Sequence, residues 1–294
     1  MMSLNEALNK FESNLKQKNR AQATLIAYKK DIEQLVDYLV SLGLANVTAV
    51  KGEHLVSYID SLSNEGYTPK TISRKINSTK TFFKFLLDEE KAIKQNPAEV
   101  VTHPKLSIKA PRILSKIEYG ALRDAVKLDN RTSAIVEILL QAGLRISEVS
   151  NIKLSDIKFP KENSKEQGVL YIPAQGSMEQ REIPLNQSVI DSINKYLKIR
   201  PNAKKDYLFI TKTGNQLLVR NIRATLGKTF KEVGLKDVKV NDLRHTFIAH
   251  HLQKGAPLYF VSKIAGHKRL STTEKYLEYI KVNQKENNFK LEEL

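Results

Sequence analysis

The chain has 294 residues, 41% of them hydrophobic, and this length favours two domains of ordinary size over one large domain. It has no cysteine, which excludes disulfides and thiolate metal sites. It has neither an 18-residue apolar run nor the apolar segment of a secretory signal, so we expect a cytoplasmic protein. The net charge of +16 favours a polyanionic partner, nucleic acid first, although an anionic membrane surface or a need for solubility would also account for it.

The first hundred residues predict four helices, because apolar side chains recur there every three or four positions. The predicted ranges are 4–17, 22–43, 48–66 and 68–90. Gly43 is a typical C-terminal cap, and Thr68 followed by Pro69 is a typical start of a helix. We therefore expect a helical N-terminal domain.

The last of these helices carries basic side chains on one side and apolar side chains on the other. Lysine and arginine mixed with small hydroxyl and amide residues suit contacts to phosphates and entry into a groove. A solvated helix face would show the same pattern. The candidate DNA-binding residues on this helix are Lys70, Arg74, Lys75 and Lys80.

Three prolines, at positions 97, 104 and 111, interrupt the helical pattern. Proline restricts itself and the residue before it to extended shapes, so we predict a linker over residues 103–112. The N-terminal domain would then span residues 1–102 and a second domain residues 113–294. Residues 106–294 hold 33 basic and 20 acidic residues, a net charge of +13, against +3 for residues 1–105.

The second domain reads as mainly α with a small antiparallel sheet. "SAIVEILLQAG" (133–143) is so apolar that it predicts a helix buried on most sides. "GVLYIPA" and "REIPLN" predict two strands around the turn "QGSMEQ", and "YLFIT" (207–211) predicts a third strand. Further helices are predicted within 220–234, 241–255, 258–266 and 272–280. The first of these carries two more candidate DNA contacts, Arg220 and Arg223.

Residues 142–157 place an arginine at the end of the buried helix. Arg145 follows the glycine turn at Gly143, where its charge lies against a core and needs a partner. Glu148 or a bound phosphate could be that partner, and Ser147 is placed to cap the next helix.

Two later segments add polar groups of the same kind. Arg244 lies in an otherwise apolar helix and shares one side of it with Asn241, three residues before. His267 follows a glycine turn between two helices, and Tyr276 lies within the second of them. Each residue taken alone is more often structural, but the ordered set points to one chemistry.

Two arginines, a histidine and a tyrosine suit reaction at a phosphodiester. Guanidinium groups bind non-bridging oxygens in bidentate fashion and stabilise the charge that grows as phosphorus is attacked, without a metal. A tyrosine hydroxyl can attack phosphorus and form a covalent phosphotyrosine, while a histidine donates a hydrogen bond or moves a proton. The sequence has no Walker loop and no cluster of acidic metal ligands, so we expect no cofactor and no metal.

These segments resemble the three signature segments of the tyrosine recombinase (phage integrase) family, most of all its short Xer-type members. The resemblance rests on "AGLRISEVSNIKLSDI", "LRHTFIAHHLQKGAPLYFVSKIAGH" and "LSTTEKY", in the family's order and spacing. Residues 68–99 resemble the family's N-terminal domain. The resemblance implies a four-helix, SAM-like core-binding domain followed by a mixed α/β catalytic domain.

The resemblance also implies roles for single residues. Arg145 and Arg244 would clamp the phosphate, Glu148 would steady the site, and His267 would be the second histidine of the family's set. Tyr276 would be the nucleophile. Tyr279, three residues further, lies outside the motif and is kept as an alternative nucleophile.

Two positions depart from the family pattern. The family usually has histidine or lysine where this chain has Asn241, and it has a lysine in the hairpin turn that acts as general acid toward the leaving 5′ oxygen. Here Gln175 or Gly176 occupies that place. Asparagine and glutamine can bind a phosphate but cannot give up a proton near neutral pH.

The function implied is a site-specific recombinase that cleaves and rejoins duplex DNA through a 3′-phosphotyrosyl link and a four-way junction. It would act on inverted half-sites as a dimer on each site and a tetramer in the synapse, either alone or with a paired recombinase. The two departures leave open a weakened DNA-binding protein that needs an active partner, and a DNA-relaxing enzyme is a third alternative. The C-terminal segment, with Phe289, Leu291 and Leu294, would either dock on a neighbouring protomer or fray.

Overall fold

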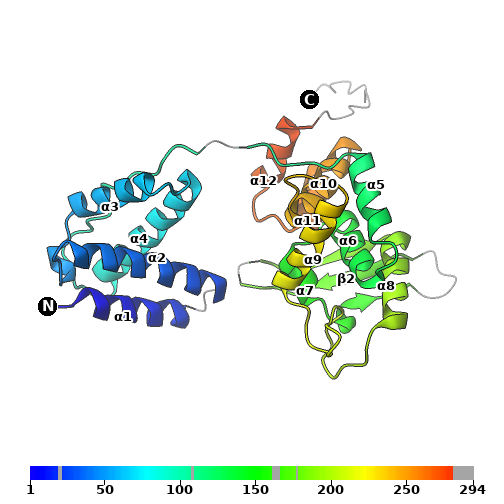
Figure 1. The fold of residues 1–294 in the computed structure, drawn as a ribbon, viewed down its shortest axis with the longest axis horizontal. Helices are drawn as coiled ribbons and strands as arrows, with labels where there is room; N and C mark the ends of the chain where they lie inside the picture. Colours follow the sequence, from blue (N-terminus) through cyan, green and yellow to red (C-terminus); the bar gives the residue numbers. More distant parts are fainter. Residues whose placement is uncertain (19–21, 107–108, 161–165, 177, 281–294) are drawn as a thin grey trace, which may run out of the picture. The chain divides into compact units, whose positions relative to one another are not determined.

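The computed structural model describes residues 1–18, 22–106, 109–160, 166–176 and 178–280 (Figure 1). The chain divides into two compact units, Met1–Lys109 and Ala110–Leu294, each with its own hydrophobic core. The division falls inside the range predicted to be the linker. None of the described helices combines the length and the apolar character needed to cross a membrane. The C-terminal segment with Phe289 lies outside the described residues.

The first unit contains the four predicted helices. They are α1 (Leu4–Gln17), α2 (Gln22–Ser41), α3 (Gly52–Asn64) and α4 (Pro69–Asp88). Thr68 caps α4 as predicted, because its hydroxyl accepts a hydrogen bond from the Thr71 amide at 3.3 Å. The third helix starts later than predicted, since a separate 3₁₀ turn, η1 (Val47–Ala49), precedes it.

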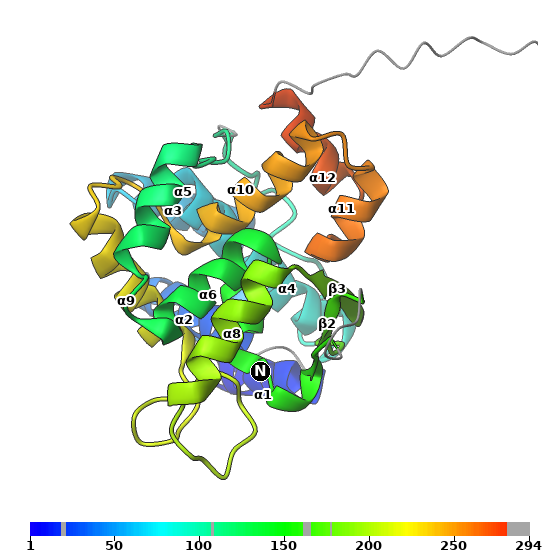
Figure 2. The same ribbon diagram turned by 90° about the vertical axis from the view of Figure 1, so that its right-hand side faces the viewer.

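The second unit is mainly helical with one small sheet, which confirms the predicted fold class (Figures 1 and 2). Its longer helices are α5 (Lys116–Ala125), α6 (Asn130–Gln141), α8 (Gln187–Ile199), α9 (Val219–Glu232), α10 (Val240–Gln253) and α11 (Leu258–Ala265). Its short helices and turns are α7 (Ile146–Asn151), η2 (Leu154–Asp156), α12 (Ser271–Glu274) and η3 (Lys275–Glu278). The buried α6 packs against α8 and α10, and α11 packs against α10, α12 and the sheet.

The sheet has the antiparallel order β1 (Ile157–Lys158), β2 (Gly168–Ile172) and β3 (Arg181–Leu185). The predicted hairpin is confirmed, with Ile172 opposite Arg181 and Gly168 opposite Leu185. The predicted strand at 207–211 is wrong. That segment makes only isolated bridges, such as Tyr207 with Lys153, because its backbone groups bond to loops rather than to one continuous partner strand.

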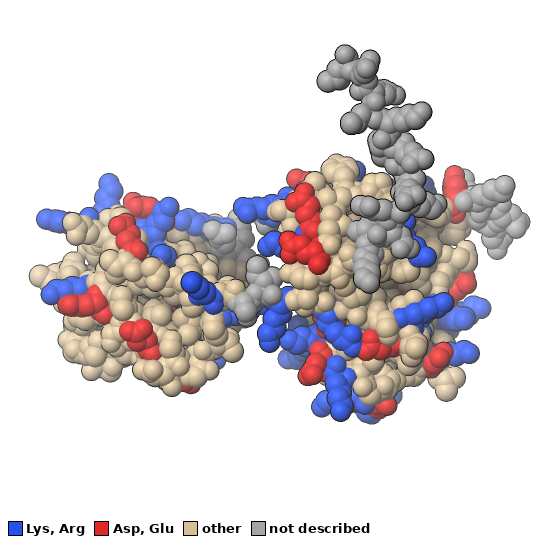
Figure 3. Space-filling model, turned by 90° about the horizontal axis from the view of Figure 1, so that it is seen from above, with Lys and Arg blue, Asp and Glu red and all other residues tan. Residues whose placement is uncertain are grey.

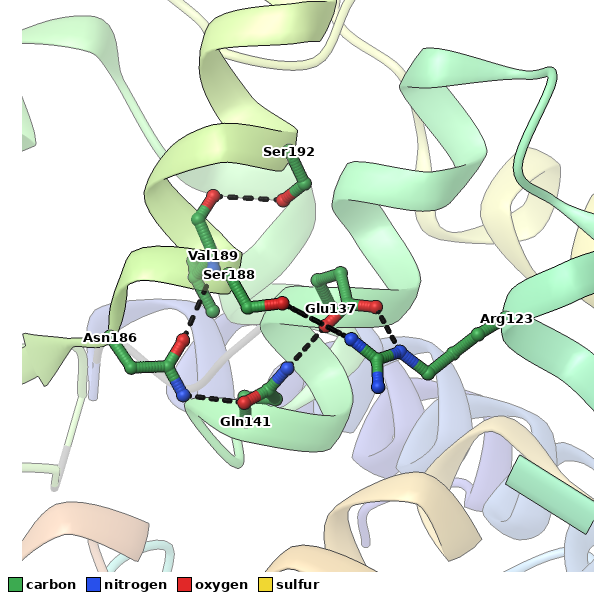
Figure 4. A network of polar contacts seen from close by, with 7 residues as sticks. All are labelled: Arg123, Glu137, Gln141, Asn186, Ser188, Val189 and Ser192. Atoms are coloured by element: carbon green, nitrogen blue, oxygen red, sulfur yellow. Dashed lines mark hydrogen bonds and ion pairs between the residues drawn. The ribbon is translucent and has the colours of Figure 1, made fainter. Parts of the chain in front are cut away.

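The apolar helix α6 holds one buried carboxylate, that of Glu137, whose residue is 6% exposed (Figure 4). Arg123 of α5 donates to it twice, at 2.5 and 3.1 Å, and Gln141 and Ser188 donate as well. A buried charge without partners would be costly. The network therefore fixes α5 and the start of α8 to α6, the helix that leads directly into the candidate site.

Candidate active site

Arg145 occupies the N-cap position of α7, immediately after the turn that ends α6. The prediction that Ser147 caps this helix is wrong, because the helix begins at Ile146 and Ser147 lies inside it. The carboxylate of Glu148 accepts from the Arg145 backbone amide at 2.8 Å and from Arg145 Nη1 at 3.0 Å. Glu148 is therefore a partner of this arginine, as predicted.

Arginines from three elements converge on the C-terminal end of α11. We call Arg145, Arg181 and Arg244 the arginine cluster. Each donates to a different one of three consecutive carbonyl oxygens: Arg181 Nε to Ile264 at 2.8 Å, Arg244 Nη2 to Ala265 at 2.6 Å and Arg145 Nη2 to Gly266 at 2.7 Å. The last carbonyls of a helix have no partner within it and carry partial negative charge, so they suit cations.

Arg181 was not predicted as a site residue. It is 6% exposed, and its Nη2 donates to Glu148 at 2.8 Å. Within the described part of the chain its buried Nη1 has no hydrogen-bond partner. The signal was present in the sequence, because strand alternation places position 181 on the same inward face as Ile183 and Leu185.

The electrostatics of the site favour an anion. Burial alone would raise the pKa of Glu148, but the hydrogen bonds and charges of Arg181 and Arg145 together outweigh it and hold that pKa below its ordinary value. Burial, followed by the charge of Arg145, lowers the pKa of Arg244 to about 10, which leaves it protonated at neutral pH. Three guanidinium groups thus face one carboxylate, and the surplus positive charge matches a phosphodiester.

Tyr276 is 6% exposed and lies in η3, a short 3₁₀ turn that continues α12, rather than in an α-helix as predicted. Its hydroxyl oxygen lies 2.5 Å from Nδ1 of His245, and burial raises the pKa of the hydroxyl to about 12, with the charge of Arg244 acting in the opposite direction. The alternative nucleophile, Tyr279, is partly exposed. A tyrosine hydroxyl that acts as a nucleophile needs a nearby base, and Nδ1 of His245 lies at hydrogen-bond distance from this one.

His245 is the second residue that the sequence analysis missed. It follows Arg244 directly, and it lies four positions after Asn241, so helix geometry places it on the same side as that asparagine. The amide nitrogen of Asn241 lies 2.8 Å from Nε2 of His245. Arg244, which was predicted to share one side of the helix with Asn241, donates to the carbonyls of Gly143, at 2.5 Å, and Ala265.

His267 lies beside the same tyrosine, with ring centroids 6.4 Å apart. Its Nδ1 is 2.7 Å from the hydroxyl of the buried Thr273. Burial, followed by the charges of Arg244 and Arg145, lowers the pKa of His267 to about 4. The imidazole is therefore neutral at pH 7 and acts there as a hydrogen-bonding group rather than as a charge.

The hairpin turn contains no lysine among its described residues, and Ser177 lies outside them. Gln175 and Met178 exchange backbone hydrogen bonds at 3.0 Å, which closes the turn, and Gly176 between them has φ of 58°. The described residues likewise contain no group of three or more His, Asp or Glu side chains able to hold a metal.

The predicted DNA contacts of the first unit divide into surface and buried residues. Lys70 and Arg74 are exposed, while Lys80 is partly buried. Lys75 is a correction: it is 4% exposed, and its ammonium group binds Asp31 at 3.1 Å and Gln34 at 2.6 Å inside the unit. Its charge stabilises a buried carboxylate and does not reach the surface.

In the second unit the remaining candidates, Arg220 and Arg223, are both exposed on α9. Lys and Arg side chains are spread over the face of each unit that Figure 3 shows, with Asp and Glu side chains between them. Arg220 and Arg223 are exposed, whereas Arg181 and Arg244 of the arginine cluster are buried and Arg145 is partly exposed.

The sequence matches two models of one family. The model described as Phage integrase family matches residues 109–282, and the model described as Phage integrase, N-terminal SAM-like domain, matches residues 8–90. The tyrosine recombinase XerC of Staphylococcus carnosus (strain TM300) is 32% identical over 261 residues, which cover 86% of this chain and 85% of that relative.

Two solved structures share the fold. The Tn1549 transposon integrase in complex with transposon right end DNA has a TM-score of 0.77 at 19% identity, and the match covers 94% of both chains. A lambda integrase dimer bound to a COC′ core site has a TM-score of 0.76 at 17% identity, with 100% of this chain and 99% of that chain covered. At these identities the likeness establishes the architecture alone.

Proposed function

Because this chain belongs to the phage integrase family of tyrosine recombinases, which break and rejoin DNA, we propose that it recombines duplex DNA at specific sites with Tyr276 as its nucleophile. The observation that carries the proposal is the position of the Tyr276 hydroxyl, buried and 2.5 Å from an imidazole. Tyr279, which is partly exposed, lacks the burial that marks Tyr276.

In the proposed reaction the arginine cluster binds the non-bridging oxygens of one phosphate. The N–H groups that are not bonded to carbonyls or to Glu148 remain for this contact, among them those of Arg145, the partly exposed member of the cluster. Tyr276 Oη then attacks phosphorus, the bond to the 5′ oxygen breaks, and a 3′-phosphotyrosyl link forms. Attack by a 5′ hydroxyl of another strand reverses the step, so the energy of the phosphodiester is kept and no nucleotide is needed.

The proposed substrate is duplex DNA with inverted half-sites, each bound by one protomer. The Tn1549 integrase is described as in complex with transposon right end DNA and the lambda integrase as a dimer bound to a core site, and the charge of +16 suits a DNA partner. Two occupied sites would form a tetrameric synapse and a four-way junction, with identical protomers or with a paired recombinase. Such a protein would work in the cytoplasm.

A weakened DNA-binding protein of the same fold is the second candidate. The observation that favours it is the hairpin turn, where Gln175 and Gly176 stand in place of a lysine. Loss of a general acid costs roughly 10²–10⁴-fold in rate. This candidate predicts specific binding without cleavage, so one experiment separates the two.

The experiment captures covalent protein–DNA adducts. The full chain is incubated with nicked fragments of its source genome, the mixture is denatured, and DNA that stays attached to protein is sequenced. We expect adducts at a defined site, their loss in Tyr276→Phe and their retention in Tyr279→Phe. Adducts that persist in Tyr276→Phe would contradict the assigned nucleophile. Specific binding without any adduct, even with a paired recombinase added, would favour the weakened protein.

A further inference from the structure

Three side chains form a continuous hydrogen-bonded chain that begins at the surface and ends at the reacting oxygen. Asn241 is exposed, His245 is half-buried and Tyr276 is buried. The two contacts measure 2.8 Å, from Asn241 Nδ2 to His245 Nε2, and 2.5 Å, from His245 Nδ1 to Tyr276 Oη. Both ring nitrogens of His245 are therefore engaged, one on each side of the imidazole.

We propose that these residues act as a nucleophile, base and orienting group, in which His245 Nδ1 takes the proton of the Tyr276 hydroxyl and Asn241 holds the ring in the tautomer that this requires. The inference rests on the proposed function, because it assigns the base for the same cleavage step. It also assigns a role to Asn241, which occupies the position where the family usually has a histidine or a lysine.

The tautomer follows from the partners of the two ring nitrogens. For Nδ1 to accept a proton, Nε2 must carry one, and its partner must then be an acceptor. In the recorded orientation the Nδ2 donor of Asn241 faces Nε2, which matches the other tautomer. A half-turn of the amide exchanges its nitrogen and oxygen and brings Oδ1 to the same position, and the proposal requires that orientation. A lysine at position 241 offers only donors and could not hold this tautomer. Asparagine therefore suits a basic His245.

Burial keeps His245 neutral before the reaction. Burial lowers its pKa, while Asp242 raises it and Arg244 lowers it to a smaller extent. Tyr276 faces it from η3, and His267, neutral at pH 7, lies on the other side of the same tyrosine. A neutral imidazole at hydrogen-bond distance from a hydroxyl is the arrangement that general base catalysis needs.

The step balances in protons and electrons. The Oη–H bond of Tyr276 breaks, its proton moves to His245 Nδ1, and the freed electron pair of Oη forms the bond to phosphorus. The bond from phosphorus to the 5′ oxygen breaks, and that oxygen leaves with the electron pair and takes a proton from water. The imidazolium then releases its proton to solvent, so the overall exchange neither gains nor loses a proton.

The first test compares His245→Gln with the unaltered chain in single-turnover cleavage of the site recovered by adduct capture. Glutamine keeps hydrogen-bonding groups but cannot accept a proton at neutral pH. We expect a loss of roughly 10²–10⁴-fold in the rate of adduct formation. His251→Gln is the matched control, since His251 is a half-buried histidine on the same helix, and we expect it to cleave at the unaltered rate.

The second test determines whether His245 takes the proton of the tyrosine nucleophile or gives a proton to the leaving oxygen. The same variants are given DNA in which sulfur replaces the scissile 5′ oxygen, because a thiolate leaves without a proton far more readily than an alkoxide. If His245 acts on the nucleophile, the defect of His245→Gln persists with the sulfur substrate. If the defect disappears with sulfur, His245 acts on the leaving group and the proposal is overturned.

A third test measures how the cleavage rate of an Asn241 variant depends on pH, which a purely structural role of Asn241 would leave unchanged. Asn241→Asp places a full negative charge beside Nε2, which favours the imidazolium, and we expect the acidic limb of the rate–pH profile to shift to higher pH. An unchanged limb would overturn the orienting role. Adducts from the unaltered chain with no defect in His245→Gln would overturn only this inference, whereas no adduct from the unaltered chain would overturn the proposed function and the base with it.

Discussion

At the scale of single residues, His267 shows how neighbouring charges set the chemistry of a side chain. Its pKa falls to about 4 because the ring is buried and lies near Arg244 and Arg145. A protonated imidazole would add a fourth positive charge to the arginine cluster. The site therefore holds this histidine in its neutral form, and the arginine cluster supplies the positive charge beside it.

This pKa predicts how stability depends on pH. In the unfolded chain His267 titrates near its ordinary value of 6.5, and in the folded chain it titrates at about 4. Between these values the unfolded state binds more protons, so the free energy of unfolding decreases as the pH is lowered through this window.

We expect His267→Gln to remove part of that decrease. Urea unfolding at about pH 7, 6 and 5 would show a shallower loss of stability than in the unaltered chain. His245 and His251, whose pKa values are also lowered, still contribute in both proteins, so the difference between the two slopes is the readout. Parallel slopes would contradict the low pKa of His267.

The sequence motif was enough to select Arg145, Glu148, Arg244, His267 and Tyr276 as candidates, and the structure brings these five together. Two further members, His245 and Arg181, were not found. His245 meets Tyr276 across 31 residues of chain, and Arg181 meets Glu148 across 33. Contacts of this kind depend on how elements pack, which spacing within one segment does not reveal. The catalytic roles of all these residues stay predictions.

At the scale of elements, glycine turns follow the two helices next to which Arg244 is held, by the carbonyls of Gly143 after α6 and of Ala265 at the end of α11. Gly143 after α6 has φ of 62° and Gly266 after α11 has φ of 66°, both in the left-handed region. Side chains also crowd these two positions. A Cβ added at Gly143 would overlap the ring of Phe247, and one at Gly266 would lie 2.9 Å from the guanidinium carbon of Arg181. Both turns thus need glycine for conformation and for space.

We expect Gly143→Ala to lower the free energy of unfolding by about 2–4 kcal/mol, from left-handed strain together with overpacking against Phe247. Gly234→Ala is the matched control, because Gly234 has φ of 70° but nothing within 4 Å of the added Cβ. We expect Gly234→Ala to lower the free energy of unfolding only by the left-handed strain, about 1–2 kcal/mol. Circular dichroism during urea titration measures both, and equal losses would contradict the steric argument.

Elements with long periodic patterns could be predicted, and short or irregular ones could not. The helix at 4–17 was predicted with its observed bounds, and the β2–β3 hairpin was found from its alternation. The two-residue β1 is too short to show a period. The 3₁₀ turn that carries Tyr276 follows α12 without a break in the sequence pattern, so it was read as continuous helix.

At the scale of the whole molecule, the positive charge is unequally distributed and unequally available. The first 105 residues carry a net charge of only +3. One of their basic residues, Lys75, forms an ion pair with Asp31 inside the unit. Surface lysines release counterions when they bind phosphates, whereas an internal one does not. Net charge alone therefore overstates the number of contacts that DNA can make.

Salt dependence of DNA binding separates the two kinds of lysine. We expect Lys70→Ala to weaken binding and to reduce the slope of log affinity against log salt by about 1, because one phosphate contact is lost. Lys75→Met should leave that slope unchanged and lower the stability of the first unit instead, since Asp31 loses a buried partner. Fluorescence anisotropy across a salt series measures both, and a reduced slope for Lys75→Met would contradict its internal placement.

The three carbonyls at the end of α11 tie the arginine cluster to one short segment. Helix α11 is eight residues long, and its last turn together with Gly266 holds one guanidinium from each of three different elements. A shift or a rotation of that segment alters all three anchors in the same movement. Each arginine keeps a second anchor, Gly143 for Arg244 and Glu148 for the other two, so a movement of α11 changes one hydrogen bond of every arginine in the cluster at the same time.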